Sequence, residues 1–392
     1  MGPSHTLSES EKVLKILTVI GTRPEAIKMA PVIKSLMDYS KEIESVVCVT
    51  AQHREMLDQA LKIFGIVPDY DLNLMNPNQS LSLLTAKVLT ALDEVLTVEK
   101  PDWVLVQGDT TTAMVTGLVA YYHRIKLGHV EAGLRTKDKF HPFPEEINRR
   151  IVDIVADAYF APTQVNRMNL LNEGVPSESI VVTGNTVIDA LMMISQRVAG
   201  RPLESRISTS IKNKLLILVT VHRRESFGKP LEDICKALAK TAIHFQDKLH
   251  IVYPVHLNPN VRKTVYEILS GISNISLIEP VDYEELVSLM SKAYLIMTDS
   301  GGIQEEAPSL HKPVLVLRDV TERPEAIEAG AAKLIGTDAD RIYSETRRLI
   351  EEPESYYQMS SAKNPYGDGQ ASWRIVQFLL GQPTEQVIDR SH

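Results

Sequence analysis

The sequence predicts an α/β fold made of two doubly wound halves, each built on a parallel sheet. Short apolar runs alternate with longer segments of helical period, and this alternation stops once and then begins again. The runs are apolar on both faces, which is typical of parallel strands covered on each side. With 392 residues, 44% of them hydrophobic and 23% charged, the chain is long enough for two such domains.

In the first half, the apolar runs are expected to form one parallel sheet. These runs are residues 14–20, 45–50, 103–107, 126–130, 158–161 and 180–183. The segments at 81–98 and 114–123 lie between them and are long enough to be crossover helices. The first half is therefore predicted to consist of β–α–β units.

The second half repeats the alternation after residues 197–213, a polar stretch without a strand pattern. Its expected strands are residues 215–221, 250–255, 275–278, 295–298 and 313–317. A last helix at 371–380 follows a turn-rich segment, which is expected to redirect the chain to the first half. The predicted organisation is a disordered tail at 1–12, domains at 13–184 and 185–365, and a returning segment at 366–392.

Composition and charge exclude several classes of protein. The net charge is −8 and no basic run is present, so nucleic acid is an unsuitable partner. No apolar stretch approaches the roughly 20 residues of a membrane span, and the N-terminus lacks an apolar signal core. Cys48 and Cys235 are expected to be buried free thiols. These features predict a cytoplasmic protein with no membrane partner.

Polar residues gather after the predicted strands, where open parallel sheets bind ligands. The first strand is followed by GTRPEAIK at residues 21–28, which brings Arg23 and Lys28 to the start of a helix. The segment RPEAI recurs at residues 323–327, again with Pro at a helix start and Arg before it. Such a helix start is a good anion site, although a solvated turn with surface charges would give the same spacing.

Carboxyl groups follow two further strands and open a helix in the first half. Asp109 ends one strand and is equally suited to capping the next helix. Glu131 follows an apolar strand between small residues, where an acid is costly unless it is paired or used. Glu145 follows a proline, as in an ordinary helix start. We expect these acids to lie on one rim of the first half.

The second half carries matching groups. His222 follows a strand, and the turn Ser300-Gly301-Gly302 before a helix would expose backbone N–H groups to a phosphate. Glu306 could accept hydrogen bonds from sugar hydroxyls or simply face solvent on its helix, and His256 suits either a cleft or a core. The scattered histidines show no metal-binding spacing, and no G-x-S-x-G or G-x-G-x-x-G motif is present. The set favours proton-transfer chemistry on a phosphate-bearing small molecule, with no metal.

A group of motifs resembles the bacterial, non-hydrolysing UDP-N-acetylglucosamine 2-epimerases, and the motifs occur in the order found in that family. They are GTRPEAIK (21–28), AQHREMLD (51–58), GDTTT (108–112), HVEAGLR (129–135), TGNTVID (183–189), HRRE (222–225), PVHLNP (254–259), SGGIQEEAP (300–308), TERPE (321–325) and NPYGDGQ (364–370). The similarity runs from about residue 15 to about residue 377.

This resemblance implies a GT-B-like fold, in which two Rossmann-type domains face each other across a cleft. It also implies interconversion of UDP-GlcNAc and UDP-ManNAc, which supplies ManNAc units for cell-surface polysaccharide. The C2 hydrogen of the substrate is not acidic until charge develops at C1. The family reaction therefore proceeds by elimination of UDP to 2-acetamidoglucal and re-addition on the other face. No cofactor is implied, and a homodimer is usual.

The resemblance also assigns roles to residues. Asp109, Glu131 and Glu145 match acid–base carboxylates, and His222 matches a histidine at the nucleotide phosphate. The other substrate-binding positions are Arg23, Lys28, Val281, Leu286, Ser300, Gly301, Gly302, Glu306 and Arg323, with Val281 and Leu286 facing uracil. Gln52, His53 and His256 lie in motifs that contact a second, activating UDP-GlcNAc in many relatives.

Three alternatives stay open at this point. A hydrolysing epimerase would release free ManNAc and UDP. A GT-B glycosyltransferase would explain a UDP site but not the carboxylates Asp109, Glu131 and Glu145. A nucleotide-sugar-binding regulator would need none of the three.

Overall fold

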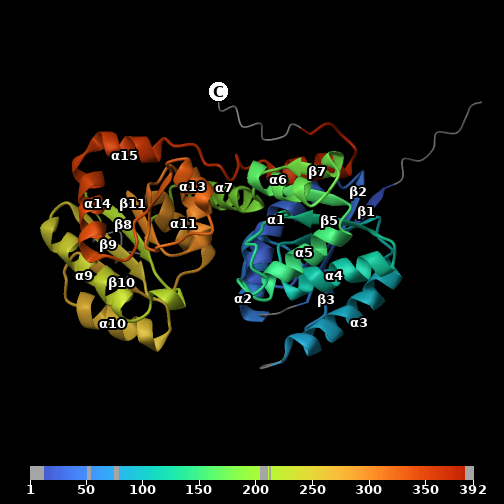
Figure 1. Cartoon of the computed structure of the whole chain (residues 1–392), viewed down its shortest axis with the longest axis horizontal. Helices are drawn as coiled ribbons and strands as arrows, with labels where there is room; N and C mark the ends of the chain where they lie inside the picture. Colours follow the sequence, from blue (N-terminus) through green and yellow to red (C-terminus); the bar gives the residue numbers. More distant parts are fainter. Residues whose placement is uncertain (1–12, 51–53, 75–78, 204–210, 212, 385–392) are drawn as a thin grey trace, which may run out of the picture. The chain divides into compact units, whose positions relative to one another are not determined.

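The computed structural model describes residues 13–50, 54–74, 79–203, 211 and 213–384. The tail expected at residues 1–12 lies outside the described residues, as do Gln52 and His53. The chain forms two compact units (Figure 1). Unit 1 comprises residues 1–190 and 369–392, and unit 2 comprises residues 191–368. The predicted α/β class with two parallel sheets is confirmed.

Unit 1 contains a seven-stranded parallel sheet of order β3-β2-β1-β4-β5-β6-β7. Its strands are β1 (Leu14–Ile20), β2 (Ile43–Val49), β3 (Tyr70–Asp71), β4 (Trp103–Gln107), β5 (Lys126–Val130), β6 (Ala158–Ala161) and β7 (Ile180–Val182). The strand order reverses between β1 and β4, which pair directly along Ile16–Thr18 and Trp103–Leu105. The loops after these strands leave toward opposite sides, and this opens a site for a ligand at their carboxyl ends.

Helices cover the sheet of unit 1 because its strands are apolar on both faces. The helices are α1 (Arg23–Asp38), α2 (Arg54–Phe64), α3 (Leu81–Glu99), α4 (Thr111–Tyr122), α5 (Glu145–Val155), α6 (Gln164–Asn172), the start of α7 (Thr186–Val198) and α16 (Ala371–Leu379). Leu17, Val19, Val104 and Val106 pack with α3, α4 and α5 in one core. Residues of opposite parity on the same strands, such as Ile16, are also fully buried.

The C-terminal helix α16 packs against α1 in unit 1. Phe378 of α16 meets Phe160 of β6 edge-on, with ring centroids 5.5 Å apart. The start of α16 is held by Asp189, whose carboxylate accepts bonds from the backbone N–H groups of Ala371 and Ser372. Residues 185–190 therefore pack with unit 1, beyond the boundary that the sequence suggested at Gly184.

Unit 2 contains a six-stranded parallel sheet of order β10-β9-β8-β11-β12-β13. Its strands are β8 (Leu215–Thr220), β9 (Leu249–Pro254), β10 (Ile275–Ile278), β11 (Leu295–Thr298), β12 (Val314–Val316) and β13 (Ala332–Leu334). Its helices are α9 (Lys229–His244), α10 (Pro259–Leu269), α11 (Tyr283–Lys292), α12 (Gly301–Glu306), α13 (Pro324–Glu328), α14 (Ala339–Glu351) and α15 (Pro353–Ser360). Here the order reverses between β8 and β11, so the residues after these strands occupy the equivalent position.

Two strands were not predicted, β3 and β13, and each lies at the edge of its sheet. They are two and three residues long, too short to show a hydrophobic period. Cys48 and Cys235 are buried free thiols, and burial raises the pKa of each to about 12. Among the described residues, no helix combines the length and apolar character of a membrane span.

Candidate active site

In unit 1, the polar groups singled out in the sequence lie at the reversal of strand order. Strands β1, β4 and β5 are consecutive in the sheet. Strand β1 is followed by helix α1, which carries Arg23 and Lys28, and β4 and β5 are followed by the turns that carry Asp109 and Glu131. The ideal Cβ position on Gly108 lies 3.6 Å from Glu131 Oε2, so the Asp109 and Glu131 turns are in direct contact. The expected shared rim is present for these residues.

The carboxylate of Glu131 is surrounded by hydrogen-bond donors. Lys28 Nζ lies 2.7 and 2.8 Å from its two oxygens, Asn185 Nδ2 donates to Oε1 at 3.0 Å, and Gln107 Nε2 donates to Oε2. Glu131 has a φ of 68°, a left-handed conformation that is costly for a non-glycine residue. Its side chain is 8% exposed. Of the two possibilities that the sequence left open for this acid, paired or used, the structure shows pairing, with Lys28 as the cation.

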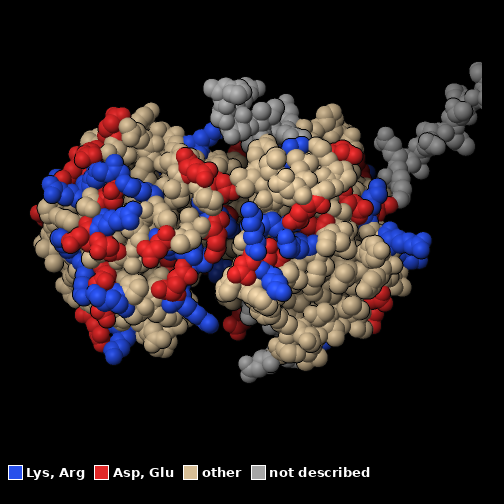
Figure 2. Space-filling model, in the orientation of Figure 1, with Lys and Arg blue, Asp and Glu red and all other residues tan. Residues whose placement is uncertain are grey.

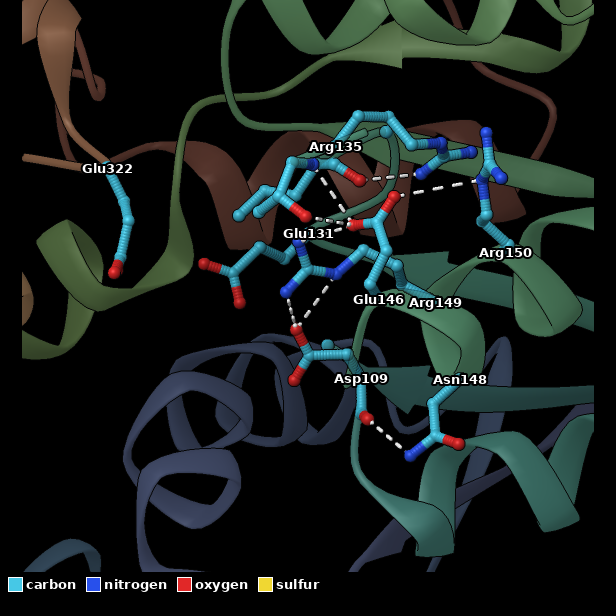
Figure 3. Close-up of polar contacts among 12 residues, drawn as sticks. Asp109, Glu131, Arg135, Glu146, Asn148, Arg149, Arg150 and Glu322 are labelled. Carbon is cyan, nitrogen blue, oxygen red and sulfur yellow. Dashed lines mark hydrogen bonds and ion pairs between the residues drawn. The ribbon is translucent and has the colours of Figure 1, made fainter. Parts of the chain in front are cut away.

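Asp109 is paired with a different cation (Figure 3). Arg149 Nε donates to Asp109 Oδ2 at 3.1 Å, Arg149 Nη2 contacts the same oxygen, and Asn148 Nδ2 donates to the Asp109 carbonyl at 2.9 Å. Helix α4 is capped by Thr110, whose Oγ1 accepts from Ala113 N at 3.0 Å. The alternative role of Asp109 as a helix cap is therefore wrong, and its carboxylate, 28% exposed, remains accessible.

Glu145 is the first residue of α5 and is half-buried, whereas its neighbour Glu146 is buried. Glu146 Oε2 accepts from Thr136 N at 3.0 Å and from Thr136 Oγ1 at 3.1 Å, and it lies 3.3 Å from Arg149 Nη1 (Figure 3). Two glutamates that look equivalent in sequence thus differ: Glu146 holds Arg149 and the preceding loop, and Glu145 is the more accessible of the two.

A fully buried histidine supports these turns from below. His129 Nε2 lies 2.8 Å from the Gly108 carbonyl and His129 Nδ1 lies 2.6 Å from Asp153 Oδ1. These two contacts hold the ring between the turn after β4 and helix α5. Burial alone would raise the pKa of Asp153, but His129 and Arg135 lower it below its ordinary value. The network fixes the backbone that carries Asp109 and Glu131.

Glu25 is a second buried acid beside this rim. It accepts from Thr110 Oγ1 at 2.8 Å and from Gly21 N at 3.1 Å, which ties the turn after β1 to the turn after β4. Burial raises the pKa of Glu25 from 4.5 to about 7, although bonds from Thr22, Thr110 and Gly21 act in the opposite direction. Folding therefore favours the protonated form of this residue.

Glu25→Gln is expected to change how stability depends on pH. The folded pKa of about 7 lies above the unfolded value of 4.5, so the wild type loses stability as pH rises between these values, by on the order of 3 kcal/mol. The variant lacks this titration, so its free energy of unfolding rises relative to that of the wild type across the same pH range. Denaturant unfolding of both proteins between about pH 5 and 8 measures the difference, and parallel pH profiles would contradict it.

In unit 2, His222 follows β8 and the Ser300 turn follows the neighbouring strand β11. The His222 ring is 43% exposed and stacks on His256, with centroids 6.1 Å apart. Burial lowers the pKa of His222, and although Asp299 opposes this shift, His256 and Arg223 add to it. His256, for which the sequence left cleft and core open, is exposed beside His222.

The remaining predicted residues of unit 2 lie on the α11, α12 and α13 segments. Ser300 is the N-cap of α12, and the ideal Cβ position on Gly301 lies 3.5 Å from Arg223 Nη2. Glu306 is buried and accepts from Tyr283 Oη. Arg323 Nε donates to the buried Glu305. Val281 and Leu286 are half-buried at the start of α11.

Several residues that hold the candidate groups were not singled out in the sequence. They are Gln107, Arg149, Asn185, Tyr283 and Asp299. Most lie inside or beside the motifs of the family resemblance, and this position was the one feature of the sequence that could have identified them. Their partners are distant in the chain, and only the fold brings them together.

Comparison with known proteins identifies the family. A family model described as UDP-N-acetylglucosamine 2-epimerase matches residues 36–380. The chain belongs to this family. The UDP-N-acetylglucosamine 2-epimerase of Salmonella typhimurium is 56% identical over 371 residues, which cover 93% of this chain and 98% of that protein. The Escherichia coli K12 enzyme of the same name is 55% identical with the same coverage.

A solved structure of the family shares the fold of this chain. The crystal structure of UDP-GlcNAc 2-epimerase from Neisseria meningitidis bound to UDP-GlcNAc has a TM-score of 0.83 and is 49% identical, covering 94% of this chain and 100% of that chain. Membership of this epimerase family, inferred above from the motifs, is confirmed. The chain thus belongs to a family of isomerases with two Rossmann-like domains.

Proposed function

We propose that this protein epimerises UDP-N-acetylglucosamine at C2 to UDP-N-acetylmannosamine, reversibly and without hydrolysis. The observation that carries the proposal is the pair of carboxylates at adjacent strand ends, Asp109 and Glu131, each bound to its own cation. An epimerase needs acid–base groups for two faces of one carbon, whereas a glycosyl transfer or simple binding needs no such pair. Family membership supports the same substrate.

The chemistry proceeds by elimination and re-addition. The C2 hydrogen adjoins no carbonyl, so it becomes removable only as the C1–O bond to UDP breaks and positive charge develops at C1. A carboxylate of unit 1 takes the C2 proton, which gives 2-acetamidoglucal and UDP. Delivery of a proton to the opposite face of C2, with return of the UDP oxygen to C1, completes the epimerisation. Asp109, Glu131 and Glu145 are the proposed acid–base groups.

Unit 2 is the proposed nucleotide-binding part. Ser300, Gly301 and Gly302 would offer backbone N–H groups to the diphosphate, with His222 and Arg323 as cationic partners. Glu306, already held by Tyr283, would bind the ribose hydroxyls, and Val281 and Leu286 would flank uracil. In unit 1, Arg23 would contact phosphate or sugar, while Lys28 would act from its place on Glu131.

The function is tested by incubating the protein with UDP-GlcNAc in D₂O and following the anomeric and C2 signals by NMR. UDP-ManNAc with deuterium at C2 is expected, because the proton returned to C2 comes from a group that exchanges with solvent. Free ManNAc and UDP would indicate the hydrolysing alternative. An epimerised product without solvent label would overturn the elimination mechanism.

Arg323→Ala is expected to weaken UDP binding by roughly tenfold to a hundredfold, the scale of a charge-assisted hydrogen bond. The substitution also leaves the buried Glu305 without the Nε donor of Arg323, so folding is checked by circular dichroism. Calorimetric titration with UDP measures the affinity. An unchanged dissociation constant would remove Arg323 from the anion site. Loss of affinity in His222→Ala would support the same site independently.

We also propose a second, activating nucleotide-sugar site to which His256 contributes. The support from the described residues is that His256 is exposed and stacked on His222. A sigmoidal dependence of rate on UDP-GlcNAc concentration that becomes hyperbolic in His256→Ala is the expected sign of such a site.

A homodimer is the proposed assembly, formed through α3, α4 and α5 of unit 1. These helices expose large apolar side chains, namely Val98, Tyr121, Tyr122, Ile147 and Ile154, the last of which is 80% exposed. Figure 2 shows a broad surface of this unit with few charged side chains. Light scattering is expected to give a dimer for the wild type and a monomer for Ile154→Glu; a monomeric wild type would contradict the proposal.

We further propose that the protein acts in the cytoplasm, which its two buried thiols support. We also propose that transfer of ManNAc to cell-surface polysaccharide consumes its product.

A further inference from the structure

Asp299 is a fully buried carboxyl group, 0% exposed, at the end of β11. Its Oδ2 accepts from His222 N at 2.9 Å, from Arg223 N at 2.8 Å and from Ser226 Oγ at 3.0 Å. A buried carboxylate is tolerated when donors of this kind satisfy it. The Asp299 side chain thus connects the turn after β8 to the end of β11, directly before the Ser300-Gly301-Gly302 turn.

The same carboxylate also faces the ring of His222. Asp299 Oδ1 lies 3.4 Å from His222 Nδ1, while His256 stacks on the ring. An anion beside Nδ1 favours a hydrogen on that nitrogen and leaves Nε2 pointing away from the carboxylate. Catalytic hydrogen bonds are often this long before a ligand binds and tighten afterwards.

We propose that Asp299 is a positioning residue for His222, which fixes the ring with Nδ1–H toward the carboxylate and presents Nε2 to the nucleotide diphosphate. This inference rests on the proposed binding of UDP by unit 2. It assigns two roles to Asp299: the carboxylate orients the His222 ring, and it also holds the turn after β8.

A comparison within the chain separates these two roles. Asp189 in unit 1 is also buried and accepts from two backbone N–H groups, of Ala371 and Ser372, and from Ser372 Oγ. Its donors are therefore of the same kinds as those of Asp299, but no histidine ring is among its hydrogen-bond partners in the described part of the chain. Asp189→Asn is the matched control for the structural role alone.

The charges around His222 set the sign of the expected effect. Burial, His256 and Arg223 lower the pKa of His222, whereas Asp299 raises it. Removing the charge in Asp299→Asn therefore lowers the pKa of His222 further. The cationic form that attracts diphosphate is then lost at lower pH than in the wild type.

The test combines calorimetry with UDP and NMR of the histidine rings in the ligand-free protein, in which His222→Ala identifies the His222 signal. Asp299→Asn is expected to weaken UDP binding about tenfold near neutral pH and to shift the His222 titration to lower pH. In the His222→Ala background, Asp299→Asn should cause no further loss of affinity. Asp189→Asn should leave the His222 titration unchanged.

Two results would overturn the proposal. One is a His222 titration that is unchanged in Asp299→Asn, and the other is an equal loss of affinity with and without His222. Should Asp299→Asn fail to fold, the ring ¹⁵N shifts of the wild type still decide, because a neutral His222 with its hydrogen on Nε2 contradicts the inference. The NMR outcome does not need UDP, so a protein that fails to bind UDP would overturn the proposed function and leave the Nδ1–Asp299 interaction to be decided separately.

Discussion

Glu131→Gln is expected to lower kcat by roughly 10²–10⁴-fold, the contribution of a general acid–base group. The amide can neither take nor return the C2 proton. UDP affinity should change little, because most of the proposed nucleotide-binding groups lie in unit 2. Steady-state kinetics of UDP-GlcNAc epimerisation, together with calorimetry of UDP binding, measures the two effects separately.

The surroundings of Glu131 require a control for stability. Its side chain is 8% exposed and paired with Lys28, and removing one partner of a buried ion pair typically costs about 3–5 kcal/mol. Glu44→Gln also removes a carboxylate from a lysine pair in unit 1, at 3.0 Å from Lys15, but Glu44 is 56% exposed. This control should retain the wild-type kcat. A Glu131→Gln protein that is folded and has a normal kcat would exclude Glu131 from the chemistry.

The sheets could be predicted from sequence because their strands carry a strong local signal. Strands β1, β4, β5, β6, β10 and β11 begin and end where the apolar runs do. Edge strands such as Tyr70–Asp71 were missed since so short a segment has no period and forms only by pairing with β2. Local pattern therefore predicts most strands, including the edge strand β10, but not the short edge strands β3 and β13.

The site was predictable only in part, and the reason is again physical. A strand end identifies Asp109 and Glu131, since polar residues after buried strands are costly unless they are paired or used. Their partners Arg149 and Lys28 come from helices 40 and 103 residues away in the chain. No local rule predicts such pairs. The family resemblance assigned Lys28 to the substrate, and the structure adds that its ammonium group lies on Glu131.

Buried support was the least visible feature in the sequence. Glu146 and Glu145 are adjacent, and only the fold shows that Glu146 is buried against Thr136 and Arg149. Asp299 likewise precedes the Ser-Gly-Gly turn without any local sign that it accepts bonds from His222 and Arg223. Tertiary contacts, which have no periodic signature, decide these roles.

Asp109→Asn is the second substitution with a large expected effect, again a loss of roughly 10²–10⁴-fold in kcat. Asparagine preserves the shape of the side chain and can still accept a bond from Arg149, so folding should be retained better than in Glu131→Gln. Asp93→Asn, which removes a carboxylate from an exposed pair with His123 in the same unit, is the control and should be fully active. Normal turnover in Asp109→Asn would remove this residue from the proposed acid–base set.

The two carboxylate variants can also be compared through exchange at C2. If Asp109 and Glu131 serve opposite faces of the sugar, each variant should be impaired mainly in removing the C2 proton from one of the two epimers. Loss of a C2 deuterium label from UDP-GlcNAc and from UDP-ManNAc, measured separately for both variants, gives this preference directly. Opposite preferences would place the carboxylates on opposite faces. A variant that is impaired equally with both substrates would mean that the replaced carboxylate acts on the departing oxygen at C1 instead of the hydrogen at C2.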